Sequence, residues 1–239
     1  MAALSIVIPH QGDSARLYEL LHLLASWPVE IVVCVAALAD PSKRPSDEHD
    51  ADLADFLNAR TPHAGRLVTS PPSRGGQIAA AIAAASGTWI WVIHSDSRPT
   101  HAALDWLFSL DPERPIWGRF DVFLTGKHPG LGLVAALMNW RSRATQICTG
   151  DQSMFFHRDL LARIEGFPAQ PLMEDIEVSR RLRSSAPGAF RAPFIRLQSS
   201  GQRWDKQGWL RTIFRMWRFR WRYARGVSAA TLFTEYYSK

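Results

Sequence analysis

The chain has 239 residues, of which 46% are apolar and 21% charged, a composition that suits one globular α/β domain and excludes extended disorder. Its two cysteines exclude a disulfide framework and lie in no metal-binding spacing, so a reducing cytoplasm is the expected location. The net charge of +6 is concentrated at residues 203–225, which hold eight Arg or Lys and one Asp.

In chain order, the first half alternates short β-rich runs with helical patterns. Strands are predicted at residues 4–8, 30–35, 66–69 and 88–93, and helices at 17–24, 53–57 and 77–85. The charged stretch 40–52 reads as a loop that leads into the second helix. This βαβαβαβ order predicts a two-sided, parallel sheet of the nucleotide-binding type.

The second half is less regular. Strands are predicted at residues 119–124, 153–157 and 190–197, and helices at 131–143, 174–183 and 206–225. The simplest organisation is one domain over residues 1–200, with a nucleotide half of about 1–98, an acceptor half of about 99–200, and a helical extension at 201–239. The longest apolar stretch, residues 20–39, contains Pro28 and Glu30, and no basic leader precedes the first strand. A soluble or membrane-peripheral protein is therefore expected.

Three polar clusters follow predicted strands, where an open α/β sheet binds its ligands. They are residues 9–13, 70–77 and 94–97. In the third, an apolar run ends abruptly in His94-Ser95-Asp96-Ser97, and a carboxylate there suits Mg²⁺ or Mn²⁺ shared with a diphosphate. An equally weighted alternative is that Asp96 or Ser97 only caps the helix after Pro99.

Two further clusters are ambiguous by themselves. The turn at 70–77 has Arg74 and two glycines before a helix, so it can approach a phosphate, but it lacks a Walker sequence and an ordinary loop explains it as well. Residues 174–177 hold three acids at the start of a helix, where acids commonly only complement the helix dipole.

Taken together, these segments resemble family 2 glycosyltransferases of the GT-A fold. The opening Ser5-Ile6-Val7-Ile8-Pro9 and the turn 70–77 resemble the family's first strand and its S-P-x-G-R-x-x-Q turn. Residues 94–97 resemble its H-A-D-T site. Segments 150–155, 166–168, 172–175 and 200–204 are similar to G-D-Q-x-x-F, G-G-F-P, L-M-E-D and S-x-R-R-W of one bacterial subgroup, some of whose members are named for arsenosugar biosynthesis.

The resemblance implies an inverting, metal-dependent hexosyl transfer from a nucleotide-sugar donor, with a UDP-linked sugar expected. Asp175 would be the catalytic base with Glu174 beside it, and Asp96 would hold Mn²⁺ or Mg²⁺. Eight residues would contact the donor: Pro9, Asp13, Arg74, Gln77, His94, Asp96, Arg203 and Trp204. The acceptor is not specified, and a lipid-linked molecule is one candidate.

The sequence also departs from the family pattern. The second strand lacks the acid that contacts the nucleotide, Gly12-Asp13 replaces Asn-Glu, and Ala79 replaces an Asn. These differences leave two alternatives open. One is a degenerate domain that binds a membrane surface or a protein, and the other is a sugar-phosphate nucleotidyltransferase. Nucleic-acid binding is disfavoured because no recognition motif accompanies the basic residues. The oligomeric state is not predicted.

The basic C-terminal segment is predicted to be an amphipathic helix. Five arginines recur at helical spacing: Arg211, Arg215, Arg218, Arg222 and Arg225. An adjacent apolar stripe holds Leu210, Phe214, Trp217 and Trp221, and most of the apolar face is expected to pack on the core, with membrane contact as the lesser alternative. Arg220 lies opposite the basic stripe and should pair with a carboxylate or a ligand phosphate.

Overall fold

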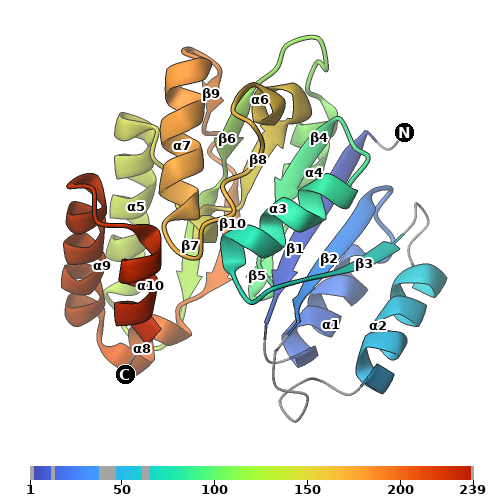
Figure 1. Cartoon of the computed structure of the whole chain (residues 1–239), viewed down its shortest axis with the longest axis horizontal. Helices are drawn as coiled ribbons and strands as arrows, with labels where there is room; N and C mark the ends of the chain where they lie inside the picture. The colour runs from blue at the N-terminus through green and yellow to red at the C-terminus, as the bar shows by residue number, and fades with distance from the viewer. Residues whose placement is uncertain (1–2, 12–13, 38–46, 61–64, 238–239) are drawn as a thin grey trace.

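The computed structural model describes residues 3–11, 14–37, 47–60 and 65–237. A seven-stranded sheet forms its centre, in the order β3-β2-β1-β4-β8-β6-β9 (Figure 1). Its first four strands are β1 (Leu4–His10), β2 (Glu30–Ala36), β3 (Gly65–Ser70) and β4 (Trp89–Val92), and they pair in parallel, as their apolar composition predicts.

The remaining strands make the sheet mixed rather than wholly parallel. They are β8 (Met154–His157), β6 (Trp117–Arg119) and β9 (Phe190–Arg191). Strand β8 runs antiparallel to both of its neighbours, β4 and β6, whereas β6 and β9 are parallel. The expected α/β fold with a mixed, mostly parallel central sheet flanked by helices is confirmed, and so is the parallel order predicted for the strands of the first half.

A second, three-stranded sheet has the order β5-β10-β7, with β5 (Ser97–Arg98), β10 (Arg196–Ser200) and β7 (Asp121–Thr125). The predicted single strands at 119–124 and 190–197 are wrong, because each divides between the two sheets. The division at 119–124 falls at Phe120, which is fully buried. The Phe120 N–H donates to the carbonyl of Gln152, and the next N–H donates to that of Ile195. The chain therefore changes sheets without losing a backbone hydrogen bond.

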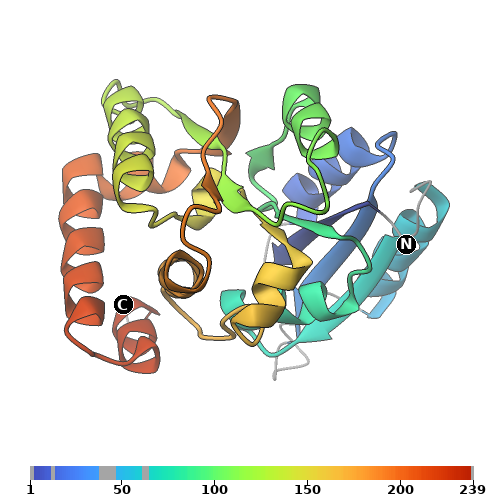
Figure 2. The same ribbon diagram turned by 90° about the horizontal axis from the view of Figure 1, so that it is seen from above.

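Helices cover both faces of the main sheet (Figure 2). One apolar cluster joins the sheet to α1, α2 and α4, and a second joins its other face to α3, α6 and α7. The predicted apolar spacing in the first helix is confirmed, since its four leucines are buried. The helices that precede the C-terminal segment are α1 (Ser14–Leu24), α2 (Asp47–Arg60), α3 (Arg74–Ala84), α4 (His101–Phe108), α5 (Leu131–Thr145), α6 (Arg158–Arg163) and α7 (Glu174–Ser185).

The C-terminal segment forms three helices, α8 (Gln202–Gln207), α9 (Trp209–Ala224) and α10 (Ala229–Tyr237). The predicted single helix at 206–225 is wrong in its first turn. Gly208 separates α8 from α9 with a φ of 78°, a left-handed conformation that glycine adopts without steric penalty. Helix α10 folds back on α9, where Arg222 pairs with Glu235, and Tyr223 ties α9 to α7 by donating to Glu177 over 2.9 Å.

The apolar face of α9 is divided between core and solvent. Phe219 is buried, and Ile213 packs against α5 and β7, as expected. The expectation of core packing is wrong for Leu210, Phe214, Trp217 and Trp221, each of which is more than half exposed. Within the described residues, no helix has both the length and the apolarity needed to cross a bilayer.

Candidate active site

The turn after β4 places Asp96 at the carboxyl edge of the main sheet, with its side chain partly exposed. The alternative role as a helix cap is wrong for both Asp96 and Ser97. Helix α4 begins at His101, and its cap is Thr100, whose hydroxyl accepts from the N–H of Ala103. Helix capping therefore does not account for the carboxylate at this position.

His94 lies beneath the short 3₁₀ turn η2 (Gly150–Gln152). A Cβ added at Gly150 would lie 2.5 Å from Cε1 of His94, so only glycine permits this packing. Burial and the Arg74 guanidinium lower the pKa of His94, while Asp151 and Asp96 act in the opposite direction. Its Nε2 is buried and has no hydrogen-bond partner in the described residues. The ring is thus neutral and held among charged groups, with one nitrogen left for a ligand.

Arg74 connects the turn before α3 with the start of α7. Its guanidinium forms an ion pair with Glu174, whose side chain is only 1% exposed, against 35% for that of Arg74. Burial lowers the pKa of Arg74, but Glu174, Asp175 and Asp151 together raise it above its ordinary value. Glu174 is therefore withdrawn from solvent, and it positions Arg74 and the first turn of α7.

Gly75, in the 70–77 turn, permits close packing between two segments of the chain. A Cβ at Gly75 would lie 2.7 Å from the carbonyl oxygen of Pro168, so this glycine allows the 168–170 segment to pass close by. Ser73 caps α3 by accepting from the N–H of Gly76 over 3.2 Å. Glycine at position 75 thus allows α3 to lie close to the segment that leads into α7.

Pro9 lies near the carboxyl end of β1, and Gln77 lies on α3 with its side chain at the ends of β1 and β2; both residues are buried. The Gln77 amide nitrogen donates to the carbonyls of His10 at 2.6 Å and Cys34 at 3.0 Å. Its donors are therefore engaged in holding the ends of β1 and β2 together. A direct contact from Gln77 to a donor molecule stays a prediction.

Asp175 occupies the first turn of α7 and is partly exposed. One carboxylate oxygen accepts from the N–H of Gly150 at 3.1 Å, and the other accepts from the N–H of Ile176 at 2.8 Å. Met173, just before the helix, has a φ of 62° and forms no side-chain cap. The first-turn acid therefore stabilises the helix end, and it also links α7 to η2.

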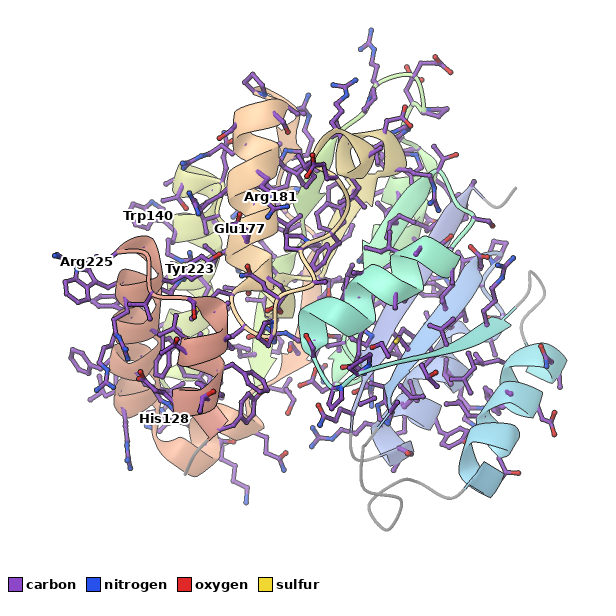
Figure 3. All side chains as sticks on the ribbon, viewed as in Figure 1. His128, Trp140, Glu177, Arg181, Tyr223 and Arg225 are labelled. Atoms are coloured by element: carbon purple, nitrogen blue, oxygen red, sulfur yellow. The ribbon has the colours of Figure 1, made fainter. Side chains whose placement is uncertain are left out.

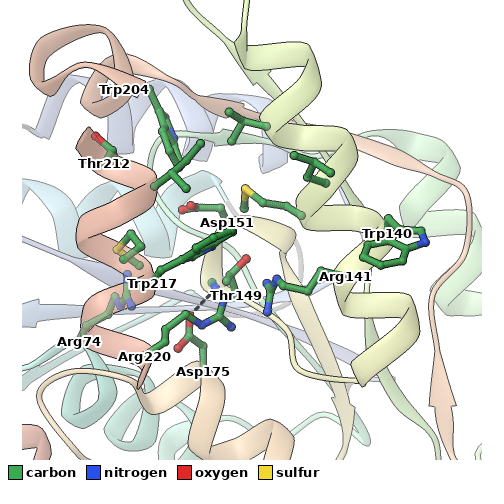
Figure 4. A pocket seen from close by; sticks show the side chains of 16 residues that line it. Arg74, Trp140, Arg141, Thr149, Asp151, Asp175, Trp204, Thr212, Trp217 and Arg220 are labelled. Atoms are coloured by element: carbon green, nitrogen blue, oxygen red, sulfur yellow. Dashed lines mark hydrogen bonds between the residues drawn. The ribbon is translucent and has the colours of Figure 1, made fainter. Parts of the chain in front are cut away.

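A cavity of about 400 Å³ opens between α5 and α9 in front of Asp175 (Figure 4). Its walls are mostly apolar and include Met138, Trp204, Ile213, Met216 and Trp217. The polar groups at its inner end are Arg74, Arg141, Thr149, Asp151, Asp175 and Arg220. Apolar walls with a few convergent polar groups are characteristic of binding sites for small molecules.

Three polar residues of this region were not named as site residues from the sequence, namely Arg141, Thr149 and Asp151. Asp151 is within the G-D-Q segment of the resemblance, which was the available signal, whereas nothing local distinguishes Arg141 from other helix-surface arginines. Of the expected donor contacts, Trp204 lines the cavity. Asp13 and the side chain of Arg203 lie outside the described part of the chain.

A divalent cation fits this region only in part. Among the described residues, no group of three or more His, Cys, Asp or Glu side chains could enclose a metal ion. Asp96 and Asp151 nevertheless supply carboxylate oxygens close to His94. Mg²⁺-type sites commonly use one or two carboxylates and complete the coordination with substrate phosphates and water. The two carboxylates therefore suit a divalent cation whose remaining ligands come from a bound diphosphate and from water.

Comparison with known proteins identifies the fold. No protein-family model matches the chain, and no curated protein matches its sequence. Among solved structures, S. aureus TarS 1-349 superposes with a TM-score of 0.61 at 14% identity, over 82% of this chain and 60% of that one. The mannosyltransferase PcManGT from Pyrobaculum calidifontis, in complex with GDP-Man and Mn²⁺, gives a TM-score of 0.61 at 20% identity, over 92% and 60%.

Glucosyl-3-phosphoglycerate synthase from Mycobacterium tuberculosis, in complex with Mn²⁺, UDP and glucosyl-3-phosphoglycerate, gives a TM-score of 0.51 at 17% identity, covering 83% of this chain and 71% of that one. This chain thus spans about 60% of the length of the first two proteins. At these identities the likeness concerns the fold, and the expected GT-A fold is confirmed.

Proposed function

We propose that the chain is an inverting hexosyltransferase, which moves a sugar from a nucleotide-sugar donor to an acceptor hydroxyl. The observation that supports it best is the convergence of Arg74, Asp96, Asp151 and Asp175 around His94, beside an apolar cavity at the carboxyl edge of the sheet. A fold by itself does not define a reaction, so the argument rests on this arrangement of charges. The division into a nucleotide half and an acceptor half remains part of the proposal.

On the donor side, Asp96 and Asp151 would share a divalent cation with the diphosphate. The cation, Mn²⁺ or Mg²⁺, would neutralise charge on the leaving group. Arg74 adds a guanidinium that can bind phosphate oxygens, since its side chain is one-third exposed although paired with Glu174. The unpartnered Nε2 of His94 faces this region and can donate or accept one further hydrogen bond.

On the acceptor side, Asp175 would take the proton from the attacking hydroxyl. The N–H groups of Gly150 and Ile176 hold its carboxylate in a fixed orientation, and each oxygen keeps lone pairs free for a substrate. Glu174 cannot perform this role without leaving its buried ion pair. We therefore assign Asp175 the role of base and Glu174 a positioning role.

Contact with the surface of an anionic membrane is a second element of the proposal. The exposed side chains of Phe214, Trp217 and Trp221 lie on α9, and the exposed Trp140 lies on α5, on the other wall of the α5–α9 cavity. Trp140 and Arg225 both project outward (Figure 3). Exposed aromatic residues flanked by arginines are typical of helices that lie at a membrane interface. Such contact would place the enzyme at the cytoplasmic face of a membrane and suit a lipid-linked acceptor.

The two rival functions make different demands. A nucleotidyltransferase would need a basic, glycine-rich loop directly after β1, whereas the sequence there is His10-Gln11-Gly12-Asp13. A degenerate binding domain is favoured by the loss of the family's acid after β2. It does not explain why the convergent carboxylates and Arg74 are retained, so the enzymatic function is preferred.

Thermal shift with nucleotides tests the proposal directly. UDP or GDP with Mn²⁺ should raise the melting temperature, because a ligand that binds only the folded state stabilises it. Asp96→Asn should remove the Mn²⁺-dependent part of that shift, while Asp105→Asn, which changes an exposed acid of α4, should not. Hydrolysis of UDP- and GDP-sugars in the presence of Mn²⁺ would then separate an enzyme from a binding domain. If neither nucleotide shifts the melting temperature, the proposed function is wrong.

A further inference from the structure

Two arginines meet at the inner end of the α5–α9 cavity, and neither forms an ion pair with a carboxylate of the described residues. Arg141 donates to the carbonyl of Ile147 over 3.2 Å, but its Nη2 is buried and has no partner. Arg220 makes no hydrogen bond or ion pair with any other described residue. Burial lowers the pKa of both groups, and for Arg141 burial and the nearby charge of Arg220 together lower it to about 10. Partly buried cations that repel each other are unfavourable unless an anion joins them.

The surrounding residues do not supply that anion. Asp175 is near enough to raise the pKa of Arg220, but no ion pair forms between them, and its oxygens accept from two backbone N–H groups. A cavity of about 590 Å³ adjoins Arg141 and Arg220 on their other side. It is lined also by Arg180 and Arg183, and no carboxylate is among its described lining residues. This side of the pair therefore has an excess of positive charge, although Arg180 is paired with Glu177.

The position of the pair favours the acceptor side over the donor side. Arg141 comes from α5 and lines the α5–α9 cavity and the adjoining basic one. A separate cavity of about 160 Å³ is lined by Gln11 and Ser73, from the carboxyl edge of the sheet. Asp175 and Arg220 line both this cavity and the α5–α9 cavity. Asp175 thus lies where the two cavities meet, and Arg141 lines the α5–α9 cavity but not the one at the edge of the sheet.

We infer that the α5–α9 cavity is the acceptor subsite and takes a molecule that carries a phosphate, held between Arg141 and Arg220, with its reacting hydroxyl facing Asp175. The role of this cavity as an acceptor subsite rests on the proposed function, whereas the phosphate site between the two arginines does not. A phosphate monoester carries a charge of about −1.5 to −2 near neutral pH, and guanidinium groups bind it in a bidentate manner. The apolar walls favour a lipid phosphate, and a small soluble phosphate is the other source.

Calorimetric titration of the nucleotide-free protein tests this inference, with three probes: octyl phosphate, glycerol 1-phosphate and the uncharged octyl glucoside. At least one phosphate should bind more tightly than octyl glucoside. Arg141→Gln and Arg220→Gln should each weaken phosphate binding about tenfold or more, because a charge-assisted bond is lost. Arg211→Gln, which changes an exposed arginine of the same helix outside the cavity, should leave binding unchanged.

The melting temperature provides a second measurement. Because Arg220 has no partner, Arg220→Gln should keep or raise the melting temperature, whereas a structural arginine would lower it. Tighter binding of octyl phosphate indicates a lipid phosphate, and tighter binding of glycerol 1-phosphate indicates a small soluble acceptor. Binding that is equal in the wild type and both variants, or that is displaced by UDP with Mn²⁺, overturns the inference. The direct titrations of the three probes omit nucleotide, so their failure is distinct from the absence of a nucleotide-induced thermal shift.

Discussion

Replacing Arg74 should destabilise the fold as well as weaken donor binding. Arg74→Gln leaves the carboxylate of Glu174, 1% exposed, without its cationic partner. Breaking a buried ion pair in this way costs about 3–5 kcal/mol, and the lower end applies because Arg74 itself is one-third exposed. With about 2–4 °C per kcal/mol for a chain of this size, a loss of about 3 kcal/mol corresponds to a melting temperature lowered by about 6–12 °C.

Arg66→Gln provides a matched control. Arg66 also pairs with a buried glutamate, Glu30, at 3.4 Å, but that carboxylate additionally accepts from the Ser86 N–H at 2.7 Å and from the Ser5 hydroxyl. Because other donors remain, and because Arg66 is half exposed, the control should lose only about 1 kcal/mol or less. Urea unfolding followed by circular dichroism measures both losses.

The pH dependence of the Arg74→Gln variant distinguishes electrostatics from lost packing. Burial raises the pKa of Glu174, and Arg74 opposes that rise. Without Arg74 the pKa rises further, so the folded variant binds a proton more tightly than the unfolded chain does. Its stability loss should therefore shrink as pH falls from about 8 to about 5.5. If the loss is independent of pH, or no larger than that of Arg66→Gln, this account of the pair is refuted.

Three further outcomes are expected. Asp175→Asn should lower turnover about 10²–10⁴-fold, as measured by steady-state kinetics, and should change donor affinity little, as measured by titration. Near-normal turnover together with a loss of about 1 kcal/mol in stability would indicate that Asp175 only stabilises the end of the helix. Sedimentation should show that the protein binds anionic but not neutral vesicles, and the double variant Arg211→Glu with Arg218→Glu should bind about tenfold or more weakly. If the protein binds neither kind of vesicle, the proposed membrane contact is wrong. Burial acts to raise the pKa of Glu30, but hydrogen bonds from Ser5 and Ser86 hold that pKa below its ordinary value of 4.5. The ionised Glu30 therefore stabilises the fold above about pH 4.5, and this stabilisation is lost as the pH falls through the lowered pKa. Glu30→Gln should accordingly narrow the difference in urea midpoint between neutral and acidic pH, and an unchanged difference would contradict this.

The sequence by itself determined most elements of the first half and the edge of the sheet where the candidate site lies. The predicted loop at 40–52 is wrong from Asp47 onward, where α2 begins. Strand β1 follows from a short unbroken apolar run, and helix α1 follows from the spacing of its leucines, which records which side of the helix is buried. Asp96 was identified for the same reason, since a polar residue that directly follows a buried strand has to lie at the end of that strand.

Only the tertiary structure decided the rest. The run 119–124 reads as one strand, because a β-rich pattern carries no information about which sheet each residue joins. The exposure of Trp217 and Trp221 was likewise undetermined, since an apolar face packs on the core only where a partner surface is available. Arg141 and Arg220 are 79 positions apart and come from different helices. Their juxtaposition beside Asp175 depends on how α5, α7 and α9 pack together, and interactions between residues so distant along the chain leave no periodic signal in the sequence.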